Sequence, residues 1–122
     1  MNDTSKTGTP PAANPDLKAM HSSLVALVVT LNASIDEAQT SAQVVAITDE
    51  IAEVNARVGA VGRQLLTQQT AAISRGAAAV AKAIPEVEAA IKKFDDIRAF
   101  VGGVTKFLRI VDKVIDVAKT VI

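Results

Sequence analysis

The stretch VEAAIKKFDDIRAFVGGVTKFLRIVDKVIDVAKTVI, residues 87–122, carries an apolar side chain at alternating steps of three and four residues. These apolar residues are Val87, Ala90, Phe94, Ile97, Val101, Val104, Leu108, Val111, Ile115, Ala118 and Ile122. A second stretch has the same spacing, through Val44, Ile47, Ile51, Val54, Val58, Val61 and Leu65. Residues spaced in this way lie along one side of an α-helix, and that side is buried against another helix. The sequence therefore predicts an all-α protein whose long helices pack in the manner of a coiled coil.

The composition disfavours several classes of function. In 122 residues, 13 Lys and Arg balance 13 Asp and Glu, so the formal net charge is zero. A neutral chain has little attraction for phosphate groups, and we expect no nucleic-acid partner. The chain has no cysteine for a disulfide or a thiolate metal site. Because it also lacks a Gly-rich phosphate loop and a His pair at metal-binding spacing, we expect no cofactor, no metal and no small-molecule substrate.

One helical domain is expected over residues 15–122, preceded by a disordered leader over residues 1–14. The leader is rich in Thr, Pro, Ser and Asn and has no apolar period. Asn14, Pro15 and Asp16 together have the form of a helix start. Asparagine is a good N-cap, proline fits the first helical position, and an acid is favourable near the positive end of a helix.

The domain is predicted to be an elongated antiparallel helical hairpin or three-helix bundle. Its expected helices cover residues 16–33, 35–84 and 85–121. Ser34 and Glu37 have the Ser-x-x-Glu spacing of a capping box, which places a tight turn at the start of the second helix. Pro85 is expected to end that helix, because proline clashes with the preceding helical turn.

A four-helix bundle is the alternative architecture. The polar segment Thr67–Thr70 interrupts the apolar stripe, and the pair Gly102 and Gly103 lies within the last expected helix. Turns at both places would give helices near residues 16–33, 35–66, 71–101 and 104–121. We favour a helix that bends at the glycine pair, because the stripe continues in phase on both sides of it. The pair is predicted either to let a neighbouring helix approach closely or to act as a hinge.

The last helix supplies the candidate interaction face. From residue 104 onward, apolar residues fill about half of its circumference, which is more than one neighbouring helix covers. Two helices of the same chain, another subunit or a lipid surface are the alternatives for covering it. The residues of this candidate face are Phe107, Leu108, Val111, Val114, Ile115, Ala118 and Ile122.

The remaining polar residues give no catalytic pattern. His21 stands next to Ser22, but adjacent helical residues point about 100° apart, so the two are not expected to act as base and nucleophile. The acidic pairs are Asp49 with Glu50, Asp95 with Asp96, and Asp112 with Asp116. None has the spacing of a metal-binding loop, and we expect them to lie on solvated helix faces.

Apolar surface without catalytic residues predicts a non-enzymatic interaction or assembly protein, either a homo-oligomer or a protein that binds a helical partner. The alternative is a protein that acts at a membrane or other lipid surface, as a peripheral coat or a helical pore-forming factor. The most apolar run, Leu24 to Leu31, is far shorter than the roughly 20 residues that span a bilayer. A signal peptide has a basic segment before its apolar run, and this run has none. We expect a cytoplasmic protein, with secretion or peripheral membrane attachment as alternatives.

Overall fold

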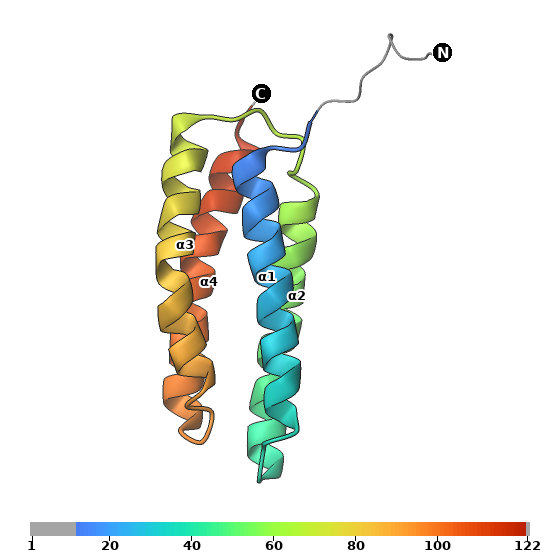
Figure 1. Cartoon of the computed structure of the whole chain (residues 1–122), viewed down its shortest axis with the longest axis vertical. Helices are drawn as coiled ribbons and strands as arrows, with labels where there is room; N and C mark the ends of the chain where they lie inside the picture. The colour runs from blue at the N-terminus through green and yellow to red at the C-terminus, as the bar shows by residue number, and fades with distance from the viewer. Residues whose placement is uncertain (1–11, 122) are drawn as a thin grey trace, which may run out of the picture.

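The computed structural model describes residues 12–121 as four α-helices joined by short connections (Figure 1). The helices are α1 (Pro15–Ile35), α2 (Ser41–Gly62), α3 (Ala71–Ile91) and α4 (Ile97–Lys119). No β-strand occurs among these residues, so the all-α prediction is confirmed. The number of helices agrees with the four-helix alternative, and the three-helix prediction was wrong. Residues 1–11, which make up most of the expected leader 1–14, and residue 122 lie outside the described residues.

The four helices form two antiparallel hairpins that face each other, α1 with α2 and α3 with α4 (Figure 1). Between the hairpins, α1 packs on α3 and α2 packs on α4, and the two helices of each such pair run in the same direction. Helices α1 and α4 lie on one diagonal, and α2 and α3 lie on the other. The connection over residues 63–70 therefore crosses the end of the molecule at which α1 begins and α4 finishes.

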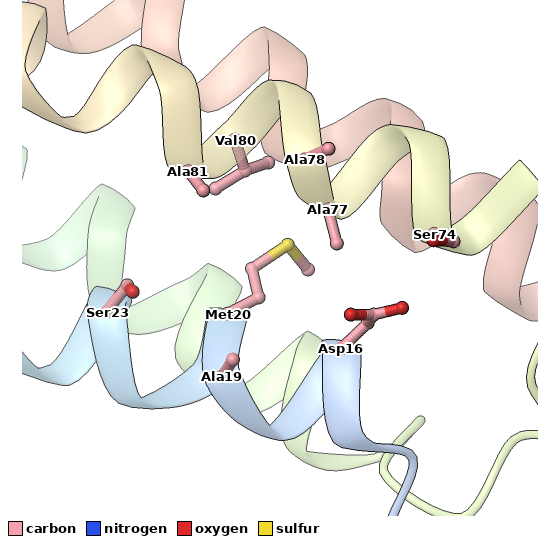
Figure 2. Close-up of a pocket in the computed structure, with 9 residues that line it drawn as sticks. All are labelled: Asp16, Ala19, Met20, Ser23, Ser74, Ala77, Ala78, Val80 and Ala81. Carbon is pink, nitrogen blue, oxygen red and sulfur yellow. The ribbon is translucent and has the colours of Figure 1, made fainter.

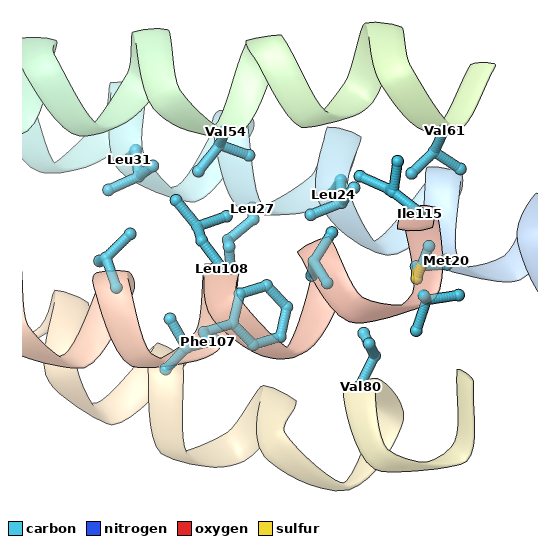
Figure 3. Close-up of a cluster of buried hydrophobic side chains, with 14 of the residues drawn as sticks. Met20, Leu24, Leu27, Leu31, Val54, Val61, Val80, Phe107, Leu108 and Ile115 are labelled. Atoms are coloured by element: carbon cyan, nitrogen blue, oxygen red, sulfur yellow. The ribbon is translucent and has the colours of Figure 1, made fainter. Parts of the chain in front are cut away.

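One core lies between the two hairpins, and all four helices contribute to it (Figure 3). Helix α1 contributes a stripe at helical spacing, and α4 contributes the largest set of buried residues. The stripe on α1 is Leu17, Met20, Leu24, Leu27 and Leu31. The set on α4 is Phe100, Val104, Phe107, Leu108, Val111, Val114, Ile115 and Ala118. Burial of these apolar side chains is the main stabilising contribution to the fold.

The first turn lies further along the chain than predicted. Helix α1 continues past Ser34, whose hydroxyl donates a hydrogen bond of 3.1 Å to the carbonyl of Thr30. Helix α2 begins after Thr40, whose hydroxyl oxygen accepts a hydrogen bond of 3.1 Å from the backbone N–H of Gln43. The prediction of a capping box at Ser34 and Glu37 was wrong, because a serine within a helix can bond back to a carbonyl in the preceding turn.

The predicted helix over residues 35–84 is divided into α2 and α3. Helix α2 ends at Gly62, and the polar segment that interrupts the apolar stripe belongs to the connection. Thr70 then caps α3, since its hydroxyl oxygen accepts a hydrogen bond of 3.1 Å from the backbone N–H of Ile73. The turn near Thr67–Thr70 in the four-helix alternative is therefore confirmed.

Pro85 lies inside α3 and does not end a helix. Proline deprives the carbonyl of the residue four positions earlier, Ala81, of its helical partner. Both Pro85 and Ala81 are exposed, so water can solvate that carbonyl. Val80 and Val87 are buried on either side of the proline, and their burial keeps the helix in place across it.

The third turn lies at residues 92–96, before the glycine pair. Asp96 caps α4, because its carboxylate accepts a hydrogen bond of 3.1 Å from the backbone N–H of Ala99. The pair Gly102 and Gly103 lies inside α4. The turn at the glycines in the four-helix alternative was therefore wrong, and a continuous last helix through them was right.

Asn14 ties the start of α1 to the connection between α2 and α3. Its side-chain oxygen accepts hydrogen bonds from the backbone N–H groups of Asp16 and Leu17, at 3.0 and 3.1 Å. Its backbone N–H donates to the carbonyl of Leu65 at 2.6 Å, and its side-chain amide donates to the carbonyl of Thr67 at 3.0 Å. The predicted helix start is confirmed. Asn14 is buried, although the sequence analysis placed it in the expected leader.

Replacement of Asn14 by alanine should lower the free energy of unfolding by about 1–2 kcal/mol, because the helix loses its cap. The substitution also removes the hydrogen bond to the connection. Asn32 is the matched control, since it is exposed and its amide donates only to Val28 within α1. Asn32→Ala should change stability by no more than about 0.5 kcal/mol. Urea unfolding measures both, and equal effects would contradict the role of Asn14.

Candidate functional site

The apolar face predicted on the last helix lies inside the molecule. Each of its described residues is at most 5% exposed, and they are Phe107, Leu108, Val111, Val114, Ile115 and Ala118. Helix α4 packs on α2 and α3 at the same time, so two helices of the same chain cover the wide face. This face is therefore inaccessible to a partner in the folded chain. Ile122, its last predicted residue, lies outside the described residues.

Gly103 permits a close approach between α3 and α4. A Cβ atom at Gly103 would clash with the Cβ of Ala90, whereas a Cβ at Gly102 would meet nothing within 4 Å. Gly76 makes a second close approach, because a Cβ there would lie 2.7 Å from Cγ2 of Val114. Of the two predicted roles of the glycine pair, close approach of a neighbouring helix is the one that the packing at Gly103 supports.

Other polar residues noted in the sequence make contacts within the fold. Asp96 caps α4, and Asp112 binds Arg57 of α2. The imidazole of His21 lies against Gly62, with Nε2 3.7 Å from the position of a Cβ on that glycine. Between residues 12 and 121, no group of three or more His, Asp or Glu side chains is placed to hold a metal ion.

Arg57 joins α2 to α4. Its Nε and Nη2 donate to the two carboxylate oxygens of Asp112 at 3.0 and 3.1 Å, and its Nη1 donates to Glu53 at 2.5 Å. The hydrogen bond to Asp112 is the main cause of a raised pKa of Arg57, and the bond to Glu53 adds to it. A bidentate pair of this kind restricts the relative position of the two helices, because the two N–H donors of the guanidinium lie in one plane.

An open apolar groove lies between α2 and α4, near the N-terminal ends of both helices. Its volume is about 530 Å³. Its lining residues are Ser41, Ala42, Val45, Ala46, Asp49, Glu50, Ile97 and Val101. Val45 is 57% exposed and is one of five large apolar residues that are exposed in the described part of the chain. The groove is therefore an apolar surface that the folded chain leaves uncovered.

Glu50 lines both this groove and an adjoining hollow of about 370 Å³ that reaches Arg57 and Asp112. It is only 7% exposed, and its carboxylate makes no hydrogen bond or ion pair with the described residues. Burial raises the pKa of Glu50, and the neighbouring carboxylates of Glu53 and Asp49 raise it further. Arg57 lowers this pKa, but less than these three effects raise it. Among the residues that the structure describes, Glu50 is thus a buried acid without a partner.

A smaller hollow of about 230 Å³ lies on the opposite side, between α1 and α3 (Figure 2). Alanines form much of its wall, and the side chain of Met20 points from α1 toward α3. Asp16 lies at one end of the hollow and accepts a hydrogen bond from the side-chain amide of Gln69. Since its carboxylate is already bound, this hollow is a weaker candidate site than the groove.

No protein-family model, curated protein or solved structure matches this chain. The two residues on which the candidate groove depends, Glu50 and Val45, were missed in the sequence analysis. Asp49 and Glu50 were assigned to a solvated face, and Val45 received no role. A signal for Glu50 was present, because it lies three residues after Ile47 and four before Val54, within the buried side of the helix.

The two glycines of α4 should respond oppositely to alanine. Gly103→Ala should lower the free energy of unfolding by about 1–3 kcal/mol, because the new methyl group overlaps Ala90. Gly102→Ala is the matched control and should raise it by about 0.4–1 kcal/mol, because it restricts the unfolded chain where the folded chain has room. Chemical unfolding followed by circular dichroism measures both effects. Stabilisation by both substitutions would contradict the close approach.

Glu50→Gln should stabilise the protein near neutral pH. The pKa of Glu50 is raised in the folded chain, so the unfolded chain ionises at lower pH and folding loses stability as the pH rises through the folded-state value. The variant should be more stable by about 1 kcal/mol at pH near 7, because a neutral amide costs less to bury than an ionised carboxylate. At about pH 3, where the carboxyl is protonated in both states, the difference should vanish.

Asp116→Asn is the control for this experiment, because it removes an exposed carboxylate of α4. It should change stability by less than about 0.5 kcal/mol at either pH. Thermal unfolding of the three proteins at the two pH values measures the effect. A Glu50→Gln protein that is less stable than the native chain at neutral pH would show that the carboxylate has a stabilising partner.

Proposed function

We propose that this protein is a non-enzymatic interaction protein that binds an α-helix of a partner protein in the groove between α2 and α4. The observation that carries the proposal is the groove itself, an open apolar surface of about 530 Å³ between two adjacent helices. Grooves of this kind bind amphipathic helices through apolar residues spaced three and four apart.

The shape of the groove suits a helix. Four of its α2 residues, Ala42, Val45, Ala46 and Asp49, lie on one side of α2 and span about 10 Å at 1.5 Å per residue. The alanines are small, so the side chains of an approaching helix can pack between them. Ile97 and Val101, one turn apart on α4, form the opposite wall.

The proposed class of function is the one that the sequence predicted, but the binding surface is the α2–α4 groove and not the apolar face of α4. The face on α4 is covered by α2 and α3, whereas the groove is open. A helix from a second copy of the chain would be the homomeric form of the same proposal, and sedimentation velocity distinguishes it from binding to another protein. The cytoplasm remains the expected compartment.

Membrane association is the second candidate, and one observation favours it. Among the described residues, α1 is a helix long and apolar enough by length and composition to cross a bilayer, although the run Leu24 to Leu31 alone is too short. Val25 and Val29, one turn apart on its outer side, are 43% and 64% exposed. A core helix meets the same criteria, and the inner stripe of α1 is buried, so the groove proposal is the stronger one.

Replacement of Val45 by asparagine tests the groove. The probe is a synthetic helical peptide of about 18 residues, with leucines at three- and four-residue spacing among alanines and glutamines. Val45→Asn should weaken its binding about tenfold, since burial of a valine contributes on the order of 1.5 kcal/mol. Val29→Asn is the matched control, because Val29 is similarly exposed on a helix but lies outside the groove. Fluorescence anisotropy measures both.

Two results would contradict this proposal. The first is failure of the native chain to bind the peptide at about 1 mM, together with a monomer at every concentration in sedimentation velocity. The second is co-sedimentation with phosphatidylcholine and phosphatidylglycerol vesicles that Val29→Asn reduces and Val45→Asn does not. The second result would favour the membrane candidate on α1.

A further inference from the structure

We propose that the helix bound in the α2–α4 groove is cationic and places the ammonium group of a lysine against the carboxylate of Glu50. This inference rests on the proposed function and specifies the chemistry of the partner. It follows from one juxtaposition, in which the apolar walls formed by Val45, Ile97 and Val101 stand beside a buried carboxylate that has no partner within residues 12–121.

The charged residues that line the groove favour a basic partner. Its two charged lining residues, Asp49 and Glu50, are both acids. Arg57, which faces the adjoining hollow, is already bound by Asp112 and Glu53. Arg109 lines that hollow from α4, but it is exposed and makes no ion pair with Glu50 among the described residues. A positively charged partner would therefore complement the groove.

The burial of Glu50 makes its carboxylate a strong site for a cation. A buried ion pair usually contributes little, because both ions must lose their hydration when the pair forms. Glu50 is only 7% exposed in the free chain, so part of the cost of its desolvation belongs to the folded state before any partner arrives. The incoming ammonium then has to lose more water than the carboxylate does. The binding free energy that a lysine contributes is therefore larger here than at a carboxylate on the open surface.

A lysine has the shape that this site requires. Its four-carbon stem can contact the apolar walls while its charged end reaches past them, as long basic side chains do on apolar surfaces. Val45 and Val101 would contact the stem, and the hollow of about 370 Å³ beyond the groove has room for the ammonium group beside Glu50. The compact ammonium ion also suits a single carboxylate better than the planar guanidinium of arginine, which prefers two acceptors.

Two synthetic helical peptides test the inference. They share the leucine-containing sequence of the groove probe and differ at one central position, which is lysine in one and norleucine in the other. Calorimetric titration should show that the native chain binds the lysine peptide about tenfold more tightly. In Glu50→Gln this preference should fall to about one, with the norleucine peptide bound at least as well as before. Asp116→Asn should keep the preference, because it makes the same change of net charge on the exposed side of α4.

The outcomes separate the inference from the function on which it rests. Equal affinity of the native chain for the two peptides overturns the cationic partner and leaves the groove proposal intact. Failure of both peptides to bind overturns the groove proposal itself. A preference that persists in Glu50→Gln overturns the role of Glu50, and a tight homodimer that Val45→Asn dissociates shows that the occupant is a second copy of the chain.

A measurement on the native chain alone keeps the inference testable if Glu50→Gln does not fold. Protonation of Glu50 removes the charge that attracts lysine, so the preference for the lysine peptide should decline as the pH falls toward about 4. The charged groups that face this site are Asp49, Glu53 and Arg57 on α2, and Arg109 and Asp112 on α4. A preference that does not change over this range, in a chain that stays helical, would overturn the inference.

Discussion

The wide apolar face of α4 is the constraint on which the rest of the structure depends. It is too wide for one neighbour, and α2 and α3 cover it together. Helix α3 can approach it because Gly103 and Gly76 carry no side chain where the two helices meet. Helix α1 then closes the core with its leucine-rich stripe, from the position diagonally opposite α4. The arrangement of two facing hairpins follows from this requirement to cover α4 on both sides.

The two contacts between the hairpins differ in chemistry, and this difference places the candidate site. Between α1 and α3, small residues leave a hollow beside Met20. Between α2 and α4, Arg57 and Asp112 form a bidentate ion pair. Glu50, two turns away along α2, is buried without a partner in the described part of the chain. Small and polar residues occupy positions on α2 where large apolar ones would close the contact, and the groove stays open there.

The turns were predicted less well than the helices, for a consistent physical reason. Ser34 and Pro85 carry strong local signals, yet each lies within a helix whose buried stripe continues past it. The segment before Asp96 contains neither glycine nor proline, and nonetheless it forms the third turn. A local signal is worth about 1–3 kcal/mol, and the burial of several apolar side chains along a helix outweighs it. At Asn14 the local signal and the tertiary contacts agree, and there the prediction held.

The sequence by itself determined that the chain is helical, where α1 begins, and which side of α4 is apolar, because spacing and capping are properties of a short stretch of chain. Only the tertiary structure decided what covers that side. Any apolar neighbour can bury an apolar surface. The spacing of apolar residues in the sequence therefore does not distinguish a helix of the same chain from a partner protein or a lipid. The tertiary structure also decided that Glu50 is buried and that the groove beside Val45 is open. Both depend on how closely α2 and α4 approach, which is a property of their packing and not of either helix alone.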